Sequence, residues 1–99
     1  MSDSTLNRVI EIFKLMCHAL LNKNTGLVVD AKKAENNGQV MLVINAYCES
    51  PRDVGILLGK KEHHPRTKDA LIKILQQVAF YAGVTKIDLT IDDMSKLPK

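Results

Sequence analysis

All of the excess positive charge of this sequence lies in one short segment. The chain of 99 residues has 14 Lys and Arg against 11 Asp and Glu, a formal net charge of +3. Residues 52–68 alone hold five basic side chains and two acidic ones. The basic residues are Arg52, Lys60, Lys61, Arg66 and Lys68. Because the rest of the chain is neutral, this pattern excludes a histone-like polyelectrolyte and favours a small domain with one site for a phosphate-bearing partner.

Two glycines divide this basic segment. Gly55 falls inside a predicted helix of about two turns, and Gly59 is expected to end that helix directly before a pair of lysines. Small residues allow another backbone to approach closely. The next helix begins with Arg66 and Lys68, where free backbone amides attract anions. Two helices that meet at a basic loop can hold a nucleic-acid strand by its phosphates without reading its bases.

The other reactive side chains lack the spacing of a catalytic or metal site. Cys17 and Cys48 are far apart in the sequence and form no CxxC pair, so both are expected to be reduced, buried thiols. His63 and His64 are adjacent, and no cluster of Cys or acids completes a metal site around them. They could make a pH-dependent contact with phosphate, but the default expectation is two solvated loop side chains. No spacing supplies a base and an oxyanion donor for a thiol nucleophile. The sequence therefore predicts no enzymatic activity, no metal and no cofactor.

Hydrophobic periodicity predicts the helices that would position the basic segment. Residues 5–22 repeat apolar side chains every three or four positions, as an amphipathic helix does. Ser50 and Pro51 are a cap residue and a first helical residue, and the Asp53 carboxylate is expected to reach back to the free amides. This second helix ends at Gly59. A third helix is expected to open at Pro65 and to close at Gly83.

Three β-rich runs predict the sheet. Residues 27–34 and 39–47 flank Glu35-Asn36-Asn37-Gly38, and Asn-Gly favours the type I′ turn of a hairpin. The second run is apolar on both faces and is expected at the centre of the sheet, with residues 86–92 beside it. A helical crossover would make those two strands parallel. The expected fold class is α+β, in the order α-β-β-α-α-β, with a mixed three-stranded sheet and its helices on one face. It forms one domain over residues 1–92, followed by a tail at 93–99.

The sequence around the basic segment resembles bacterial single-KH-domain RNA-binding proteins. Residues Pro51-Arg52-Asp53-Val54-Gly55-Ile56-Leu57-Leu58-Gly59-Lys60-Lys61 resemble their run of proline, acid, aspartate, aliphatic, glycine, two variable residues, aliphatic, glycine and lysine. Arg66-Thr67-Lys68-Asp69-Ala70-Leu71 resembles their Arg-Thr-x-x-Ala-Leu opening of the next helix. The predicted order of elements is that of the type II KH fold, so the resemblance covers residues 5–92. In that family a Gly-x-x-Gly loop grips about four nucleotides by their backbone.

The resemblance implies a non-enzymatic protein that binds single-stranded RNA. The residues expected to contact RNA are Arg52, Val54, Gly55, Leu57, Leu58, Gly59, Lys60, Lys61, Arg66 and Lys68, with the aliphatic ones forming the wall of the groove for the bases. Glu62 stands where the family has its second glycine, and the loop is about three residues longer before Arg66. A carboxylate there repels phosphate. This departure favours the alternative, a KH-derived protein-interaction or dimerisation module that has lost RNA binding.

Met41, Val43 and Tyr47 share one face of the predicted central strand. They could form an interface with a second copy or with a partner protein, because helices on one side of a sheet leave its other side uncovered. Long side chains of the neighbouring strands could equally cover them. No apolar run reaches the length of a signal peptide or a membrane span, so a cytoplasmic location without membrane contact is expected.

Overall fold

The computed structural model describes residues 3–59 and 67–97, which form helices and strands in the order α1-β1-β2-α2-α3-β3. Their bounds are α1 Asp3–Leu21, β1 Leu27–Asn36, β2 Gln39–Cys48, α2 Pro51–Leu58, α3 Thr67–Ala79 and β3 Val84–Asp93. Two 3-10 turns complete the described part of the chain, η1 at Phe80–Ala82 and η2 at Met94–Lys96. The predicted α+β class and order of elements are therefore confirmed.

The sheet has the strand order β1-β2-β3, with β2 at its centre. β1 runs antiparallel to β2, and β3 runs parallel to it. In the turn between β1 and β2, Asn37 has a φ of 53° and Gly38 a φ of 79°, the two left-handed residues that a type I′ turn requires. The hairpin, the central strand and the parallel pairing were all predicted, and all three predictions are confirmed.

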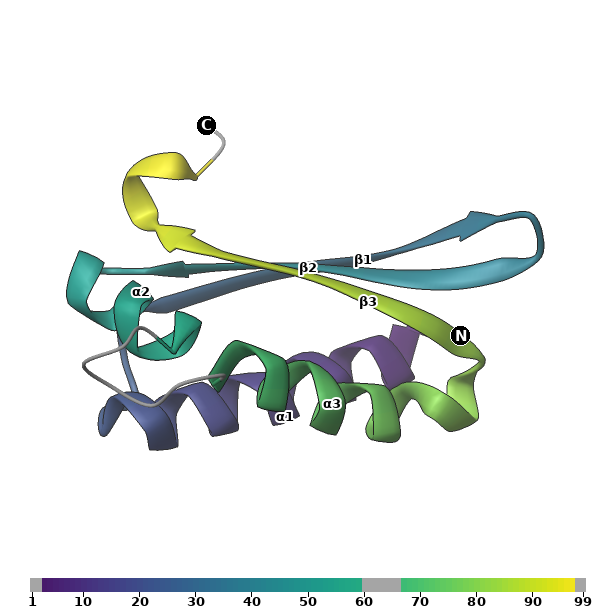
Figure 1. The fold of residues 1–99 in the computed structure, drawn as a ribbon, viewed down its shortest axis with the longest axis horizontal. Coiled ribbons are helices and arrows are strands. Elements are labelled where there is room, and N and C mark those ends of the chain that lie inside the picture. Colours follow the sequence, from purple (N-terminus) through teal and green to yellow (C-terminus); the bar gives the residue numbers. More distant parts are fainter. Residues whose placement is uncertain (1–2, 60–66, 98–99) are drawn as a thin grey trace.

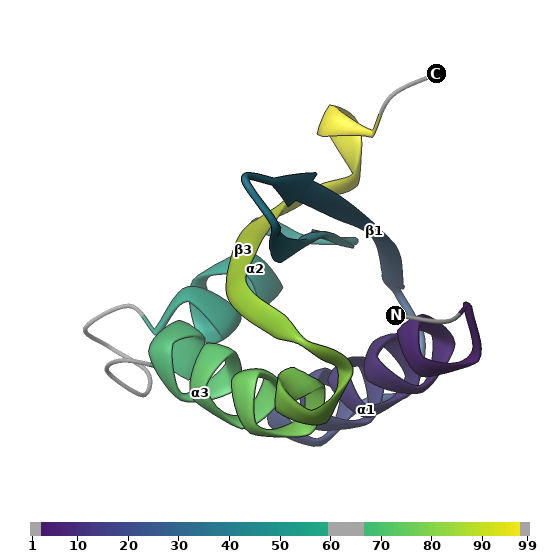
Figure 2. The same ribbon diagram turned by 90° about the vertical axis from the view of Figure 1, so that its right-hand side faces the viewer.

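The helices lie on one face of the sheet, below it in the view of Figure 1. Seen end-on, α1 lies under β1 and α3 under β3 (Figure 2). Side chains of β2 alternate accordingly, because every second residue from Leu42 to Cys48 faces the helices and is buried. The other core residues are Val9, Phe13, Cys17 and Leu21 of α1, Leu57 of α2, Leu71, Leu75 and Ala79 of α3, and Val84, Ile87, Leu89 and Ile91 of β3. This packing fixes α2 and α3 beside the same strand, β3.

The described elements end close to where the sequence places them, with four differences. The helix expected to close at Gly83 ends earlier, because α3 stops at Ala79 and Gly83 instead caps turn η1. Strand β1 extends to Asn36, two residues beyond its expected end. Strand β3 is longer than expected and runs from Val84 to Asp93. Asp93, expected in the tail, instead caps η2, because its carboxylate accepts a hydrogen bond of 2.9 Å from the Ser95 amide. The hydrogen bonds from Ser95 lower the pKa of Asp93. Turn η2 therefore extends from the end of β3 and rises above the face of the sheet that the helices leave open (Figure 1).

No helix among the described residues is long and apolar enough to cross a lipid bilayer.

Candidate nucleic-acid interface

Helix α2 begins with the cap that the sequence predicts. Ser50 has an extended backbone, and its hydroxyl accepts a hydrogen bond of 3.3 Å from the amide of Asp53. Pro51 takes the first helical position, where no amide hydrogen is needed. The prediction for the Asp53 carboxylate is wrong, however. It pairs with the side chain of Lys23, from the connection between α1 and β1, at an Oδ2 to Nζ distance of 2.6 Å.

Lys23 joins two carboxylates and so ties α2 to the end of α1. Its ammonium lies 2.8 Å from Glu49 Oε1 as well as 2.6 Å from Asp53 Oδ2. The Asp53 side chain is only 6% exposed, whereas that of Glu49 is 52% exposed. Asp53 Oδ2 has no hydrogen-bond partner of good geometry among the described residues, so the contact with Lys23 acts through charge. The two carboxylates, Asp53 first, raise the pKa of Lys23.

Gly59 ends α2 in the left-handed conformation, with φ at 74° and ψ at 45°. Its amide donates a hydrogen bond of 3.1 Å to the carbonyl of Ile56. A residue with a Cβ adopts this backbone at a cost, which explains why glycine occupies the position. The predicted end of α2 is thus confirmed. The chain leaves the helix there, and the sequence continues with Lys60 and Lys61.

The residues predicted to contact RNA divide into three groups. Lys60, Lys61 and Arg66 lie outside the described residues, as do Glu62, His63, His64 and Pro65. Arg52 is exposed on the first turn of α2, and Lys68 is half-buried on the first turn of α3. The remaining five are apolar and glycine residues of α2 and of its end, namely Val54, Gly55, Leu57, Leu58 and Gly59.

The apolar wall predicted on α2 needs one correction. Leu57 is fully buried, because it lies four residues after Asp53 on the inward face of the helix and packs into the core. It cannot line an open groove in this conformation. Val54 and Leu58 remain half-buried at the surface, where they pack partly against the core. Gly55 is buried as well, so its role there is close packing of α2.

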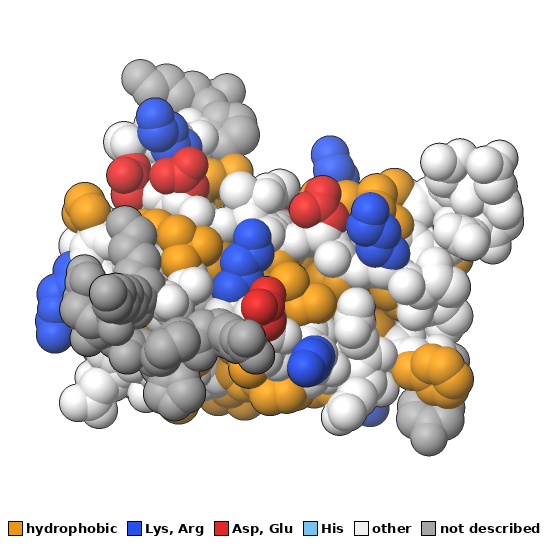
Figure 3. Space-filling view, in the orientation of Figure 1, with side chains coloured by type: hydrophobic (Ala, Val, Ile, Leu, Met, Phe, Trp, Pro, Cys, Tyr) orange, Lys and Arg blue, Asp and Glu red, His pale blue; other side chains and the backbone are white. Residues whose placement is uncertain are grey.

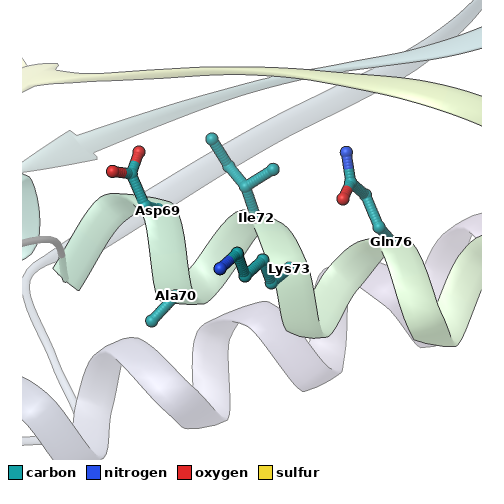
Figure 4. A pocket seen from close by; sticks show the side chains of 5 residues that line it. All are labelled: Asp69, Ala70, Ile72, Lys73 and Gln76. Atoms are coloured by element: carbon teal, nitrogen blue, oxygen red, sulfur yellow. The ribbon is translucent and has the colours of Figure 1, made fainter.

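Helix α3 carries further residues at the surface beside α2 that were not predicted from the sequence. An open concavity of about 520 Å³ is lined by Asp69, Ala70, Ile72, Lys73 and Gln76. Figure 4 shows Asp69, Ile72 and Gln76 on the side of α3 that is turned toward the sheet. Ile72 is half-buried, whereas Asp69 and Gln76 are exposed. Ile72 and Gln76 follow Lys68 in steps of four residues, and this spacing was the signal in the sequence that could have identified them.

This side of the molecule combines apolar surface with charges of both signs. Figure 3 shows hydrophobic side chains in the strip between α3 and β3, with basic and acidic side chains beside them. A base could pack on the aliphatic surface there, the side-chain amide of Gln76 could donate or accept a hydrogen bond at its edge, and the carboxylate of Asp69 could accept one. The carboxylate of Asp69 disfavours a phosphate directly beside it.

The two cysteines are unsuited to nucleophilic chemistry at neutral pH. Both are fully buried. Burial first, with the neighbouring Cys48 second, raises the pKa of Cys17 to about 12. Burial also raises the pKa of Cys48 to about 11, Asp53 adding to the rise and Lys23 opposing it. A reactive thiol needs the opposite shift. Among residues 3–59 and 67–97, no group of three or more His, Cys, Asp or Glu side chains could hold a metal ion.

Comparison of this chain with protein-family models, with curated proteins and with solved structures finds no match.

Proposed function

We propose that the protein binds the backbone of single-stranded RNA at the junction between α2 and α3, without catalysing a reaction. The resemblance of residues 51–71 to single-KH-domain RNA-binding proteins supports this function. The observation that carries the proposal is the end of α2, where left-handed Gly59 turns the chain out of the helix immediately before Lys60 and Lys61. The chain resumes as α3 at Thr67. Between these two helix ends the sequence carries three basic side chains, which would contact successive phosphates.

Arg52 and Lys68 would extend this contact on both sides of the loop. Arg52 is exposed on the first turn of α2, and Lys68 lies on the first turn of α3, so neither is enclosed in the core. Both helices contact β3, which keeps their relative positions fixed. Because phosphate contacts alone carry no sequence information, the binding would tolerate many RNA sequences.

The bases would lie against the side of the molecule beside α2 and α3. Val54 and Leu58 of α2 and Ile72 of α3 offer aliphatic surface, and Gln76 offers an amide that can hydrogen-bond a base edge. Single-stranded RNA is preferred to a duplex, since only splayed bases can reach such a surface. Glu62, at the position of the family's second glycine, lowers the affinity through repulsion of phosphate, whereas the contacts of lysine and arginine with phosphates make binding weaken as salt rises.

A titration of labelled single-stranded RNA tests this function. We expect wild-type protein to bind at ~50 mM salt and the variant Lys60→Ala/Lys61→Ala to bind at least about 10-fold more weakly. The matched control is Lys33→Ala/Lys96→Ala, which removes two exposed lysines from β1 and η2 and should bind as wild type does. Absence of binding by wild type, or equal loss in both variants, would contradict the proposal. The former result would favour the alternative, a protein-interaction module derived from a KH domain.

A further inference from the structure

The face of the sheet opposite the helices carries a regular pattern of side chains. We call this surface the open face. It consists of four rows across the strands β1, β2 and β3, which the strand registers define as Ala34-Met41-Lys86, Lys32-Val43-Asp88, Asp30-Asn45-Thr90 and Val28-Tyr47-Asp92. The central position of three rows is apolar, and most of the flanking positions are charged.

The apolar residues of the open face keep part of their surface accessible. Met41, Val43 and Tyr47 are half-buried, and Val28, opposite Tyr47, is 40% exposed. In the described part of the chain no α-helix covers this face, and turn η2, which contacts β2, lies over one end of it (Figures 1 and 2). Side chains of the neighbouring strands therefore shield the central stripe only in part. Met41, Val43 and Tyr47 thus form an apolar stripe along β2, with mostly charged side chains of β1 and β3 on its two sides. An apolar centre with a polar rim is typical of a protein interface.

The charges of the open face are complementary to those of a second copy of the same face. A two-fold axis between two facing sheets, perpendicular to the strands, can pass between the rows of Val43 and Asn45. The first row then faces the fourth, and the second faces the third. Lys32 meets Asp30 of the second copy, and Lys86 meets Asp92 of the second copy, so symmetry creates four pairs of opposite charge and none of like charge.

The same axis also matches the apolar positions. Met41 meets Tyr47 of the second copy, where a thioether can contact an aromatic ring. Ala34 meets Val28 of the second copy. Asp92 already accepts a hydrogen bond of 2.9 Å from the Asp93 amide, and this bond holds its carboxylate in place beside the sheet. Facing sheets with nearly aligned strands are a common packing in proteins, so the arrangement needs no unusual geometry.

Turn η2 favours this axis over one that runs along β2. It rises above the open face at the end of β3 (Figure 1). An axis along β2 would bring the η2 turns of both copies to the same end, where they would compete for space. That axis would also place Asn45 against Asn45 of the second copy and Tyr47 against Tyr47 of the second copy. Its only pair of opposite charges would be Lys32 with Asp88 of the second copy, formed twice by symmetry. With antiparallel strands the two η2 turns lie at opposite ends.

We propose that the open face is the interface of a symmetric homodimer in which the β2 strands of the two copies face each other in antiparallel orientation. Three strands ~4.8 Å apart and four rows ~7 Å apart span roughly 14 by 27 Å, which is small for a specific interface. The dimer therefore forms at high protein concentration and dissociates on dilution. Its formation is independent of RNA binding, because the residues proposed to contact RNA belong to α2, α3 and the segment between them.

Sedimentation equilibrium up to about 1 mM protein tests the dimer and its orientation. Wild type should associate reversibly. In Asp30→Lys, the new lysine faces Lys32 of the other copy twice, and in Lys32→Asp two carboxylates face each other twice. Each variant alone should associate at least about 10-fold more weakly than wild type. A 1:1 mixture of the two variants should recover the wild-type constant, because every charge then faces its opposite.

The control variant is Lys33→Asp, which has the same change of charge on the same strand but pairs in register with Leu42 on the helix side of the sheet. It should associate as wild type does. A wild type that stays monomeric at 1 mM overturns the homodimer. Wild-type association by Asp30→Lys, or failure of the mixture to recover, overturns the antiparallel orientation. Circular dichroism of each variant checks that loss of association does not reflect loss of folding.

Discussion

The two buried thiols predict how the free energy of unfolding changes at alkaline pH. Cys17 of α1 and Cys48 of β2 both lie in the core between the helices and the sheet, and both are fully buried. Their pKa values are raised from 9.0 to about 12 and about 11. The unfolded chain exposes both thiols to water and returns them to their ordinary value. At pH values between the unfolded pKa and the folded pKa of each thiol, the native protein keeps a thiol proton that the unfolded chain releases.

The sign of the effect follows from this difference. A group whose pKa is raised in the folded state contributes its full stability below the unfolded pKa and loses it as pH rises toward the folded pKa. Stability should thus be unaffected by the thiols up to pH ~8 and should fall above pH ~9. At pH ~10 each thiol accounts for a loss of about 1.4 kcal/mol, so the pair accounts for about 3 kcal/mol.

The assay is urea unfolding at pH 7 and pH 10 under reducing conditions, for wild type and for Cys17→Ala/Cys48→Ala. Lysines and tyrosines titrate in both proteins, so the difference between the two pH effects isolates the thiols. We expect wild type to lose about 3 kcal/mol more than the variant between the two pH values. If the double variant is too unstable to measure, each single variant should show about half the difference. An equal loss in wild type and variant would refute the burial of the thiols between α1 and β2.

Two further predictions concern the ends of α2. Asp53→Asn should lower the free energy of unfolding by about 1–3 kcal/mol, because it leaves a nearly buried polar group without the Lys23 ion pair, whereas Glu49→Gln, at an exposed carboxylate, should cost less than about 1 kcal/mol. Urea unfolding measures both, and equal effects would contradict the difference in burial. Gly59→Ala should cost about 1–2 kcal/mol, and Gly59→Asn less, because Asn tolerates the left-handed backbone of that position. Equal thermal shifts for the two variants would contradict the left-handed end of α2.

Local sequence signals predict most of the fold because each has a direct physical cause. Asn37-Gly38 supplies the two left-handed residues of a hairpin turn, and Ser50-Pro51 supplies a cap and a first helical residue. The apolar character of β2 on both faces reflects its place between two strands. These signals involve residues that are close in the chain, so no tertiary information is needed to interpret them.

The failures concern positions that only tertiary packing decides. Val54, Leu57 and Leu58 are all apolar within about two helical turns, so periodicity cannot show which one points into the core. The packing of α2 against the core buries Leu57. The ion pair of Asp53 with Lys23 joins residues far apart in the sequence, and the pattern around Asp53 pointed instead to the local cap. Ile72 and Gln76 went unnoticed because an amphipathic helix explains their spacing without any ligand.

The salt dependence of RNA affinity tests the proposed backbone contact at the α2–α3 junction most directly. Each phosphate contact to a single strand contributes a slope of about −0.7 to the plot of log K against log salt concentration. If Lys60 and Lys61 each contact one phosphate, the slope for Lys60→Ala/Lys61→Ala should be shallower than that for wild type by about 1.4, and the slope for Lys33→Ala/Lys96→Ala should be unchanged. Parallel plots for wild type and Lys60→Ala/Lys61→Ala would contradict capture of the RNA backbone at this junction.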